Sequence, residues 1–237
     1  MLSKPPGESP DHPDELAQLP HGRHGLPQEF VEHNQRERLI AAFTELVGEV
    51  GYNEATISAT TAGAAVSSRT FYRYFATIEE CYLGAFEVAL ERLGQPLREA
   101  YESESEWPLR VRAALAAVLA RLAADPATAR LLTAEPFVAG SAVAERYKAA
   151  LEATAPYLKA GRELRDAAAP ELPETTEKGL LGAINSLIAR KVSAGEAGDL
   201  PSLHPDLVQF ALTPYLGAAA ARDVATENHD SSLTSTQ

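Results

Sequence analysis

The residues whose types and spacing suggest chemistry lie between positions 56 and 75, where two short helices joined by a tight turn are predicted. The second helix carries arginine, threonine and tyrosine where a core helix would carry leucine. Arginine can donate two hydrogen bonds to guanine, and hydroxyl groups suit phosphate oxygens. The pattern therefore predicts a helix with one packing face and one face that contacts a nucleic acid.

The charge of the chain does not favour DNA binding by bulk attraction. The 237 residues carry a formal net charge of −12, and the isoelectric point is about 5.0. Between residues 31 and 76, four arginines are outnumbered by five glutamates. DNA binding would therefore depend on the local placement of arginines and helix N-termini.

The N-terminal segment, residues 1–30, is rich in Pro, Gly, Asp and His and is predicted to be a disordered arm. Arg23 on this arm could reach DNA phosphates or a minor groove. His21 and His24 could hold a metal on a helical face, but the neighbouring glycines disfavour a helix and no third ligand is near. We therefore predict no metal and no cofactor.

Composition excludes several functional classes. The single cysteine, Cys81, lies in an apolar stripe and is interpreted as a core residue, so no disulfide framework exists. The sequence has no apolar run long enough for a membrane span and no signal peptide, which predicts a soluble cytoplasmic protein. Because no nucleophile–base pair or phosphate loop is present, we do not expect an enzyme.

Hydrophobic periodicity predicts helices throughout and strands nowhere, so the expected fold class is all-α. In the N-terminal part, Asn34 and Glu37 resemble a capping box, and Gly51 ends the first helix. Thr56 and Ser67 are expected to cap the second and third helices. The expected helices cover about residues 34–50, 56–64, 67–75, 77–101, 108–124, 126–132, 141–165 (kinked at Pro156), 175–194 and 204–221.

The segment V-S-S-R-T-F-Y-R-Y-F, residues 66–75, resembles the TetR/AcrR family of bacterial transcriptional regulators. The resemblance covers about residues 34–90, and a weaker likeness to the family's final helix lies at residues 200–217. It implies a helix-turn-helix DNA-binding domain at 31–80 and a ligand-binding and dimerisation domain at 81–225. The remaining residues, 226–237, are expected to be a disordered tail.

The resemblance also implies roles for individual side chains. Phe71 and Phe75 would face inward and lock the reading helix in place. Ser68, Arg69 and Arg73 would contact bases, whereas Ser67, Thr70, Tyr72 and Tyr74 would mostly contact phosphates. The full set of expected DNA-binding residues is Arg23, Arg36, Ser67, Ser68, Arg69, Thr70, Tyr72, Arg73 and Tyr74.

Three residues depart from the family pattern. Ala65 stands where a turn glycine is usual, and a left-handed conformation there would cost alanine energy. Thr60 replaces an isoleucine and directs a hydroxyl toward the core. Ile78 replaces a lysine that often contacts phosphate, a loss that Arg23, Arg36 or Arg38 could offset.

The helical body is expected to act as a sensor. Aromatic side chains could line a ligand pocket, although an aromatic at helical spacing can equally be core. These candidates are Phe86, Tyr101, Trp107, Phe137, Tyr147 and Tyr157. The last two helices would form a dimer interface, the alternative being a monomer with the same helices packed internally. The expected interface residues are Leu181, Ile184, Leu187, Ile188, Leu207, Phe210, Leu216 and Gly217.

The sequence thus predicts a DNA-binding transcriptional regulator, a ligand-responsive repressor that binds a palindromic operator as a homodimer. The expected partners are a double-stranded operator, a second copy of the chain and an apolar or aromatic small molecule, but no membrane. One alternative is a dimeric, helical ligand-binding scaffold whose DNA-binding module has decayed. A helical enzyme is the other alternative, which no catalytic constellation supports.

Overall fold

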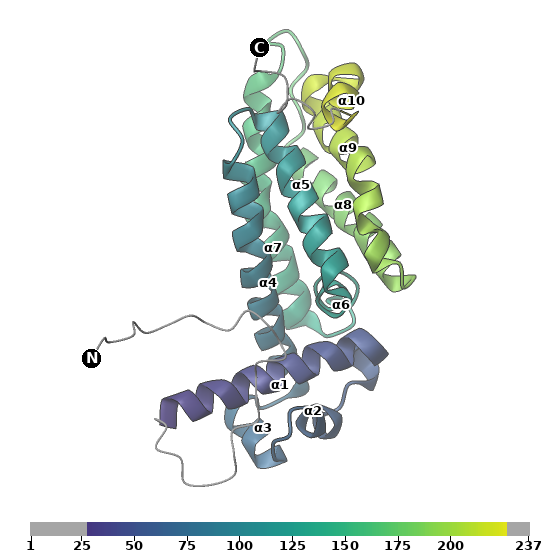
Figure 1. Ribbon diagram of the computed structural model, residues 1–237. Coiled ribbons are helices and arrows are strands. Elements are labelled where there is room, and N and C mark those ends of the chain that lie inside the picture. The colour runs from purple at the N-terminus through teal and green to yellow at the C-terminus, as the bar shows by residue number, and fades with distance from the viewer. Residues whose placement is uncertain (1–27, 227–237) are drawn as a thin grey trace, which may run out of the picture.

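The computed structural model describes residues 28–226 of the chain, which form helices and no strand. The expected all-α class is confirmed. Figure 1 shows two parts: α1 lies across the base of the molecule with α2 and α3 beneath it, and a taller bundle stands on α1. The lower part consists of α1 (Gln28–Val50), η2 (Tyr52–Glu54), α2 (Ile57–Gly63) and α3 (Ser68–Tyr74).

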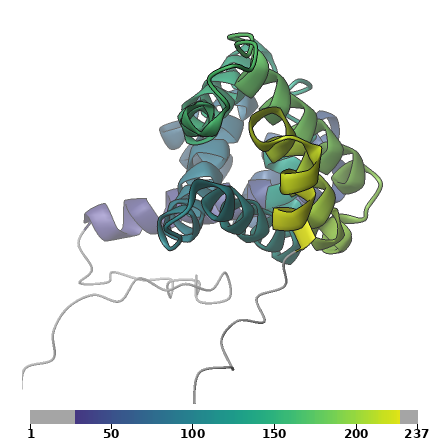
Figure 2. The ribbon, with the colours of Figure 1, turned by 90° about the horizontal axis from the view of Figure 1, so that it is seen from above.

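The upper part is a bundle whose helices surround a common interior, as the view from above shows (Figure 2). The helix α4 (Ile78–Glu102) belongs to this bundle and begins at the base, where it contacts α1. The other elements are α5 (Trp107–Ala124), α6 (Pro126–Thr133), α7 (Ser141–Lys159), η3 (Ala160–Leu164), α8 (Thr176–Ser193), η4 (Ala197–Leu203), α9 (His204–Leu216) and α10 (Ala218–Thr226).

Three of the predicted helix starts are formed as the sequence indicated. The side chains of Thr56, Ser67 and Thr77 each accept a hydrogen bond from the backbone N–H three residues further on. Such a cap satisfies one of the N–H groups that a helix leaves without an internal partner. These caps therefore fix where α2, α3 and α4 begin.

Three predicted boundaries are wrong. The α-helix expected over 141–165 ends at Lys159, and the chain continues to Leu164 as the 3-10 helix η3. The first helix begins at Gln28, so Asn34 lies inside α1 and is not its cap. The expected single helix over 204–221 is two helices, because Gly217 adopts a φ of +79° and ends α9 at Leu216. A positive φ is available to glycine without steric cost, and it reverses the chain direction before α10.

A buried tyrosine joins the two parts of the molecule. Tyr82 of α4 is fully buried, and its ring packs edge-on against Phe43 of α1 and Tyr52 of η2 at centroid distances of 5.9 and 5.5 Å. Its hydroxyl donates to the backbone carbonyl of Leu131 in α6. One side chain thus connects α1, α4 and α6 without leaving a buried polar group unpaired.

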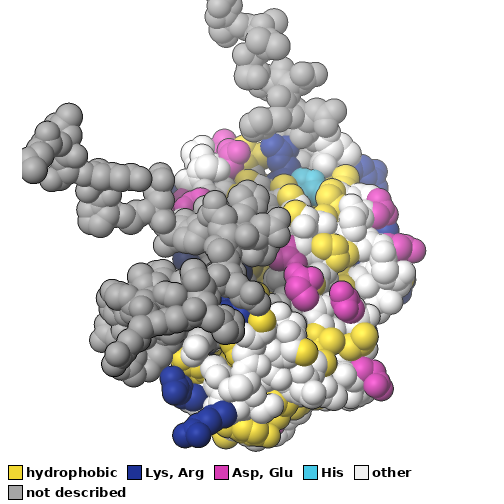
Figure 3. All heavy atoms as spheres, turned by 60° about the horizontal axis from the view of Figure 1, so that its bottom comes forward, with side chains coloured by type: hydrophobic (Ala, Val, Ile, Leu, Met, Phe, Trp, Pro, Cys, Tyr) yellow, Lys and Arg dark blue, Asp and Glu magenta, His cyan; other side chains and the backbone are white. Residues whose placement is uncertain are grey.

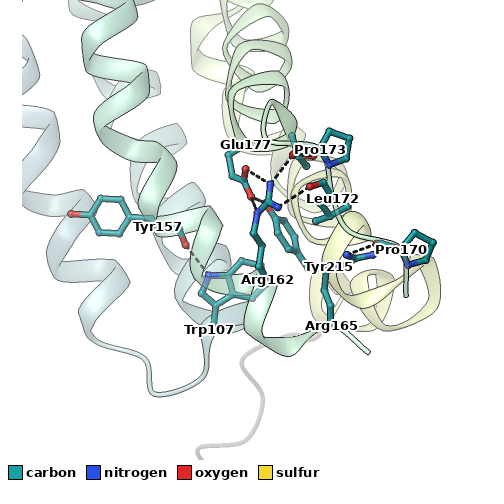
Figure 4. A network of polar contacts seen from close by, with 10 residues as sticks. Trp107, Tyr157, Arg162, Arg165, Pro170, Leu172, Pro173, Glu177 and Tyr215 are labelled. Atoms are coloured by element: carbon teal, nitrogen blue, oxygen red, sulfur yellow. Dashed lines mark hydrogen bonds and ion pairs between the residues drawn. The ribbon is translucent and has the colours of Figure 1, made fainter. Parts of the chain in front are cut away.

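A partly buried ion pair ties η3 to the start of α8 (Figure 4). The guanidinium of Arg162 donates to both carboxylate oxygens of Glu177, at 2.7 and 2.8 Å, and also to the carbonyls of Leu172 and Pro173. Tyr215 of α9 donates its hydroxyl to the same carboxylate at 3.0 Å. The Arg162 guanidinium holds the pKa of Glu177 below its usual range despite burial.

The turn between α2 and α3 contains the one non-glycine residue with a positive φ in the described part of the chain, Ala65 at +51°. The sequence predicts that a left-handed conformation at Ala65 would be strained, and Ala65 has that conformation. The guanidinium of Arg38 in α1 donates to the carbonyls of Ala64 and Ala65, the latter at 3.3 Å. These bonds hold the turn against α1 although alanine disfavours its conformation.

We expect Ala65→Gly to stabilise the protein. A left-handed conformation costs an L-residue ~1–2 kcal/mol, and the greater freedom of glycine in the unfolded chain offsets ~0.4–1 kcal/mol of the gain. The net increase in the free energy of unfolding should be about 0.5–1 kcal/mol, measured by urea denaturation. The exposed helical residue Ala62 provides the control, since Ala62→Gly should destabilise by ~1 kcal/mol. A loss of stability in both variants would show that Ala65 is unstrained.

Candidate nucleic-acid interface and interior cavity

The helix α3 presents a polar face away from the rest of the protein. Phe71 is fully buried and Phe75 nearly so, with their ring centroids 5.6 Å apart. Because these two side chains fix the inward side of the helix, Arg69, Tyr72 and Arg73 are exposed on its outer side. Arginine and tyrosine hydroxyl groups on an accessible helix are suited to base edges and phosphates.

Several predicted contact residues also have structural roles. The Ser67 hydroxyl accepts the capping bond of α3 and lies 2.9 Å from the Thr70 hydroxyl. Tyr74 donates its hydroxyl to the side-chain oxygen of Gln35 in α1 at 3.2 Å. The Arg36 guanidinium lies over the ring of Phe75, 5.7 Å from its centroid. These groups position α3 and leave the exposed arginines and Tyr72 as its most accessible side chains.

The basic charge at this end of the molecule is local. Figure 3, which brings the lower part forward, shows a few Lys and Arg side chains beside hydrophobic and neutral ones, with Asp and Glu side chains on the same face. Arg38, considered as a phosphate contact, instead holds the α2–α3 turn. This surface is therefore suited to nucleic-acid contacts by a few individual arginines, and not to broad electrostatic attraction.

The departure at Thr60 costs the core little. Its side chain is fully buried, and its hydroxyl donates to the carbonyl of Thr56 at 2.9 Å. A hydroxyl that bonds to the preceding helical turn is satisfied, so an apolar partner is not required. The other departure, Ile78, occupies the first position of α4 and packs against the core.

Some predictions concern residues outside the described range. Arg23, His21 and His24 belong to this group. Within residues 28–226, no cluster of His, Cys, Asp or Glu side chains is arranged to hold a metal ion. No helix in the same range is long and apolar enough to cross a lipid bilayer.

The bundle encloses a cavity of about 210 Å³. Its walls come from α4, α5, α6, α7 and α8 with one residue of α9, and its lining is largely leucine, isoleucine, valine and aromatic side chains. Concave, apolar spaces with few polar groups are the usual form of small-molecule sites. No charged side chain contributes to the lining.

Four of the six predicted pocket aromatics line this cavity, namely Phe86, Tyr101, Tyr147 and Tyr157. The prediction is wrong for the other two. Trp107 donates its indole N–H to the carbonyl of Tyr157 at 2.8 Å and packs against Tyr215, so it closes the end of the bundle (Figure 4). Phe137 lies in the α6–α7 loop and is 64% exposed.

Sequence reasoning missed most of the cavity lining, because aliphatic residues at helical spacing do not distinguish a cavity from a core. The lining includes Ile184 and Ile188, which were assigned to the dimer interface. That assignment needs correction for both residues and for Leu207, since all three are buried inside the single chain. Leu181 also lines the cavity, and Leu216 packs against the core. Of that predicted set, Leu187, Phe210 and Gly217 remain exposed.

An ion pair at the end of α6 contacts the lower part of the molecule. Arg130 of α6 donates to Glu135 at 2.8 Å, and a second of its nitrogens donates to the carbonyl of Gly48 in α1 at 3.2 Å. Glu135 is buried and accepts a longer bond, 3.4 Å, from the backbone N–H of Tyr52. The pair therefore contacts both sides of the junction between α1 and α6.

The same junction is closed by a near contact between backbones. A Cβ placed on Gly48 would lie 2.5 Å from the Cβ of Ala127 and 2.7 Å from its Cα. Only glycine allows α1 and α6 to approach this closely. Because Leu132 and Thr133 of α6 line the cavity, this helix connects the cavity wall directly to α1.

Known proteins share this arrangement. Residues 39–85 match the sequence pattern of the family described as bacterial regulatory proteins, tetR family. No curated protein matches the sequence. The fatty acid degradation regulator FadR from Bacillus halodurans is 19% identical, with a TM-score of 0.64 over 74% of this chain and 97% of its own.

Two further solved structures have the same fold. FadR from Bacillus subtilis, in complex with stearoyl-CoA, is 16% identical, with a TM-score of 0.62 over 76% of this chain and 98% of its own. A TetR-like transcriptional regulator from Rhodococcus sp. RHA1 is 17% identical, with a TM-score of 0.56 over 80% of this chain and 97% of its own.

The lower part, with its exposed α3 face, thus has the helix-turn-helix arrangement of this family's DNA-binding module. The chain's DNA-binding module is that of the tetR family, and its helical body has the fold of TetR-like regulators.

We expect Gly48→Ala to destabilise the protein by ~1–3 kcal/mol, because the new methyl group must separate α1 from α6. Urea denaturation gives the change in the free energy of unfolding. The matched control is Gly94→Ala in the middle of α4, where the nearest atom is the end of the flexible Arg98 side chain. This control should gain ~0.5–1 kcal/mol from the helix propensity of alanine. Equal effects at the two glycines would mean that the α1–α6 contact is loose.

Proposed function

We propose that the protein is a ligand-responsive repressor that binds a palindromic operator as a homodimer. The single observation that carries this proposal is the junction: α6 forms part of the cavity wall and also contacts α1 through Arg130 and Gly48. A cavity whose wall helices α4 and α6 also contact α1 is the arrangement that a ligand-controlled switch requires. Access to DNA implies that the protein acts in the cytoplasm.

In this proposal Arg69 and Arg73 read base edges in the major groove. Both side chains are exposed on the outer face of α3, opposite the buried Phe71. Tyr72, which is 58% exposed, is placed to donate its hydroxyl to a phosphate. One short helix contacts few base pairs, so two modules would bind half-sites about one turn of DNA apart.

The effector would enter the cavity and act through α6. A ligand that favours a different position of α6 changes how α1 sits on the body, and with it the separation of the two reading helices. We assign a larger share of this coupling to α6 than to α4, because the α6 contact is closed by an ion pair and a glycine. Reciprocity requires that such a ligand bind the operator complex more weakly, by a coupling of ~1–3 kcal/mol.

The apolar character of the cavity supports a ligand with a large apolar part. FadR from Bacillus subtilis, which has a similar fold, was solved with stearoyl-CoA. That ligand belongs to the relative, and for this chain the lining supports only the general class of a largely apolar effector.

The dimer would form along the outer faces of α8 and α9. Leu187 and Phe210 are 38% and 43% exposed there, which is unusual for large apolar side chains in the described part of the chain. Gly179 and Gly182 of α8 have nothing within 4 Å of an added Cβ, so a partner helix could approach their backbone closely. Exposed apolar side chains beside small residues favour helix packing between two copies.

The alternative of a scaffold with a decayed DNA-binding module has specific support in the strained Ala65 turn and the net charge of −12. The exposed arginines of α3 favour the regulator. Binding to random duplex DNA and its dependence on salt would separate the two functions, because phosphate contacts give a linear fall of log affinity with log salt.

The proposed reading role predicts the behaviour of two arginine variants. After selection of an operator from randomised duplexes, Arg69→Ala and Arg73→Ala should each lose ~1–3 kcal/mol of discrimination at one base-pair position. The control is Arg98→Ala, which removes one positive charge from an exposed position of α4. Sequencing of bound duplexes gives the preference at every position. If the selected operator is an inverted repeat and both α3 variants keep its base preference at every position, these arginines contact phosphate or solvent instead of bases.

The proposed interface predicts that Leu187→Glu and Phe210→Glu yield monomers, because each would bury an unpaired charge between two copies. Multi-angle light scattering over a range of protein concentrations measures the change in mass. Val138→Glu, at a residue 47% exposed in the α6–α7 loop, should leave the mass of the dimer unchanged. Ile184 is unsuitable for this test because a charge there would disrupt the cavity. Dimers that persist in both interface variants would refute the α8–α9 surface.

A further inference from the structure

The polar groups of the cavity are few, and most are already used. The hydroxyls of Thr133 and Thr154 donate to carbonyls of their own helices, both at 2.7 Å. Tyr101 donates to the carbonyl of Tyr157 at 3.3 Å. A hydroxyl bonded in this way has its single proton committed and offers a ligand only a weaker acceptor. These three residues therefore contribute mainly shape.

Asn185 of α8 is different. Its side chain lines the cavity and carries an amide that can both donate and accept hydrogen bonds. Tyr147 of α7 also lines the cavity and is nearly fully buried. Burial raises the pKa of the Tyr147 hydroxyl, and an interaction with the Asn185 side chain offsets part of that rise. The two groups thus form a polar pair in an otherwise apolar wall.

The second constraint on a ligand is charge. Because no Lys, Arg or His lines the cavity, an ionised carboxylate or phosphate inside it would lose its hydration without gaining a partner. An amide beside a phenol hydroxyl, in contrast, can both donate to and accept from a neutral group. The lining therefore selects against anions and favours one neutral hydrogen-bonding group.

The third constraint is size. A cavity of about 210 Å³ corresponds to roughly seven water-sized groups at ~30 Å³ each. A chain of six carbons with one terminal hydroxyl has about that size.

We propose that Asn185 and Tyr147 determine effector specificity, and that the effector is a small, uncharged and largely apolar molecule whose single hydrogen-bonding group they bind. The inference rests on the proposed function in taking the cavity as the effector site. It goes further by naming the residues that recognise the ligand and the chemical class that they accept.

Isothermal titration calorimetry on the full chain without DNA tests the proposal with four matched probes: hexanol, chlorohexane, hexanoate and hexanoyl-coenzyme A. Hexanol should bind at least tenfold more tightly than chlorohexane, which has the same chain but a much weaker hydrogen-bonding group. Hexanoate at neutral pH should bind at least tenfold more weakly than hexanol. These ratios correspond to ~1.4 kcal/mol or more per comparison.

Asn185→Leu should reduce the affinity for hexanol about tenfold and leave that for chlorohexane unchanged or higher. Tyr147→Phe should show the same loss of preference in smaller degree. The control is Tyr157→Phe, which removes a hydroxyl at the Tyr101 end of the cavity, where the two rings are 4.9 Å apart. It should keep the preference for hexanol. Thermal unfolding of each variant without ligand verifies that it is folded.

Three results would overturn the proposal: equal binding of hexanol and chlorohexane, tighter binding of hexanoate or hexanoyl-coenzyme A than of hexanol, or an unchanged preference in Asn185→Leu. Each concerns the cavity alone. A failure of the proposed function would appear instead as the absence of a selected operator, since the calorimetry contains no DNA. The two failures are therefore distinguishable.

Discussion

The close approach of α1 to α6 is the constraint on which the rest of the structure depends. Gly48 lies so near Ala127 that no side chain fits between the helices, and the Arg130–Glu135 pair closes the edge of the contact. The guanidinium also binds a backbone carbonyl of α1, so the orientation of the pair is fixed by both partners. Because a contact without spare volume transmits displacement, a change in α6 cannot leave α1 unaffected.

Contacts with α1 also fix the orientation of α3, so a chain with an acidic net charge still presents exposed arginines in a defined position. The aromatic pair Phe71 and Phe75 fixes one side of α3, and Arg36 over the Phe75 ring and Tyr74 bonded to Gln35 fix its orientation on α1. Exposed arginines then project from a helix that cannot rotate. Specificity in such a surface comes from position, and attraction of the whole molecule to phosphate contributes little.

The bundle has a cavity in its interior and specific side-chain contacts at both of its ends. At one end, Arg162, Glu177 and Tyr215 tie α8 to α9, and Trp107 packs against the same tyrosine (Figure 4). At the other end, the Tyr82 ring joins α4 to α1 and η2. Between them the helices enclose space instead of packing fully. A cavity between two fixed ends allows the helices around it to respond to a ligand while the bundle stays intact.

The sequence by itself determined the local structure. Thr56, Ser67 and Thr77 specify three helix starts because a side-chain oxygen can reach a backbone N–H only three residues away, which is a local geometric fact. The inward direction of Phe71 and Phe75 follows from their spacing of four, and the strain at Ala65 follows from the turn it occupies. The fold class needed nothing more than helical periodicity.

Only the tertiary structure decided which apolar face meets which neighbour. Ile184 and Phe210 look alike in the sequence, yet one lines the cavity and the other is exposed. Periodicity shows that a helix has an apolar stripe. When the stripe is wide enough to contact two neighbouring helices, periodicity does not show which neighbour belongs to the same chain and which to a second copy. The roles of Arg38 and Arg130 were hidden for a related reason. Their partners are backbone carbonyls 26 and 82 residues away, and a carbonyl leaves no mark in the sequence.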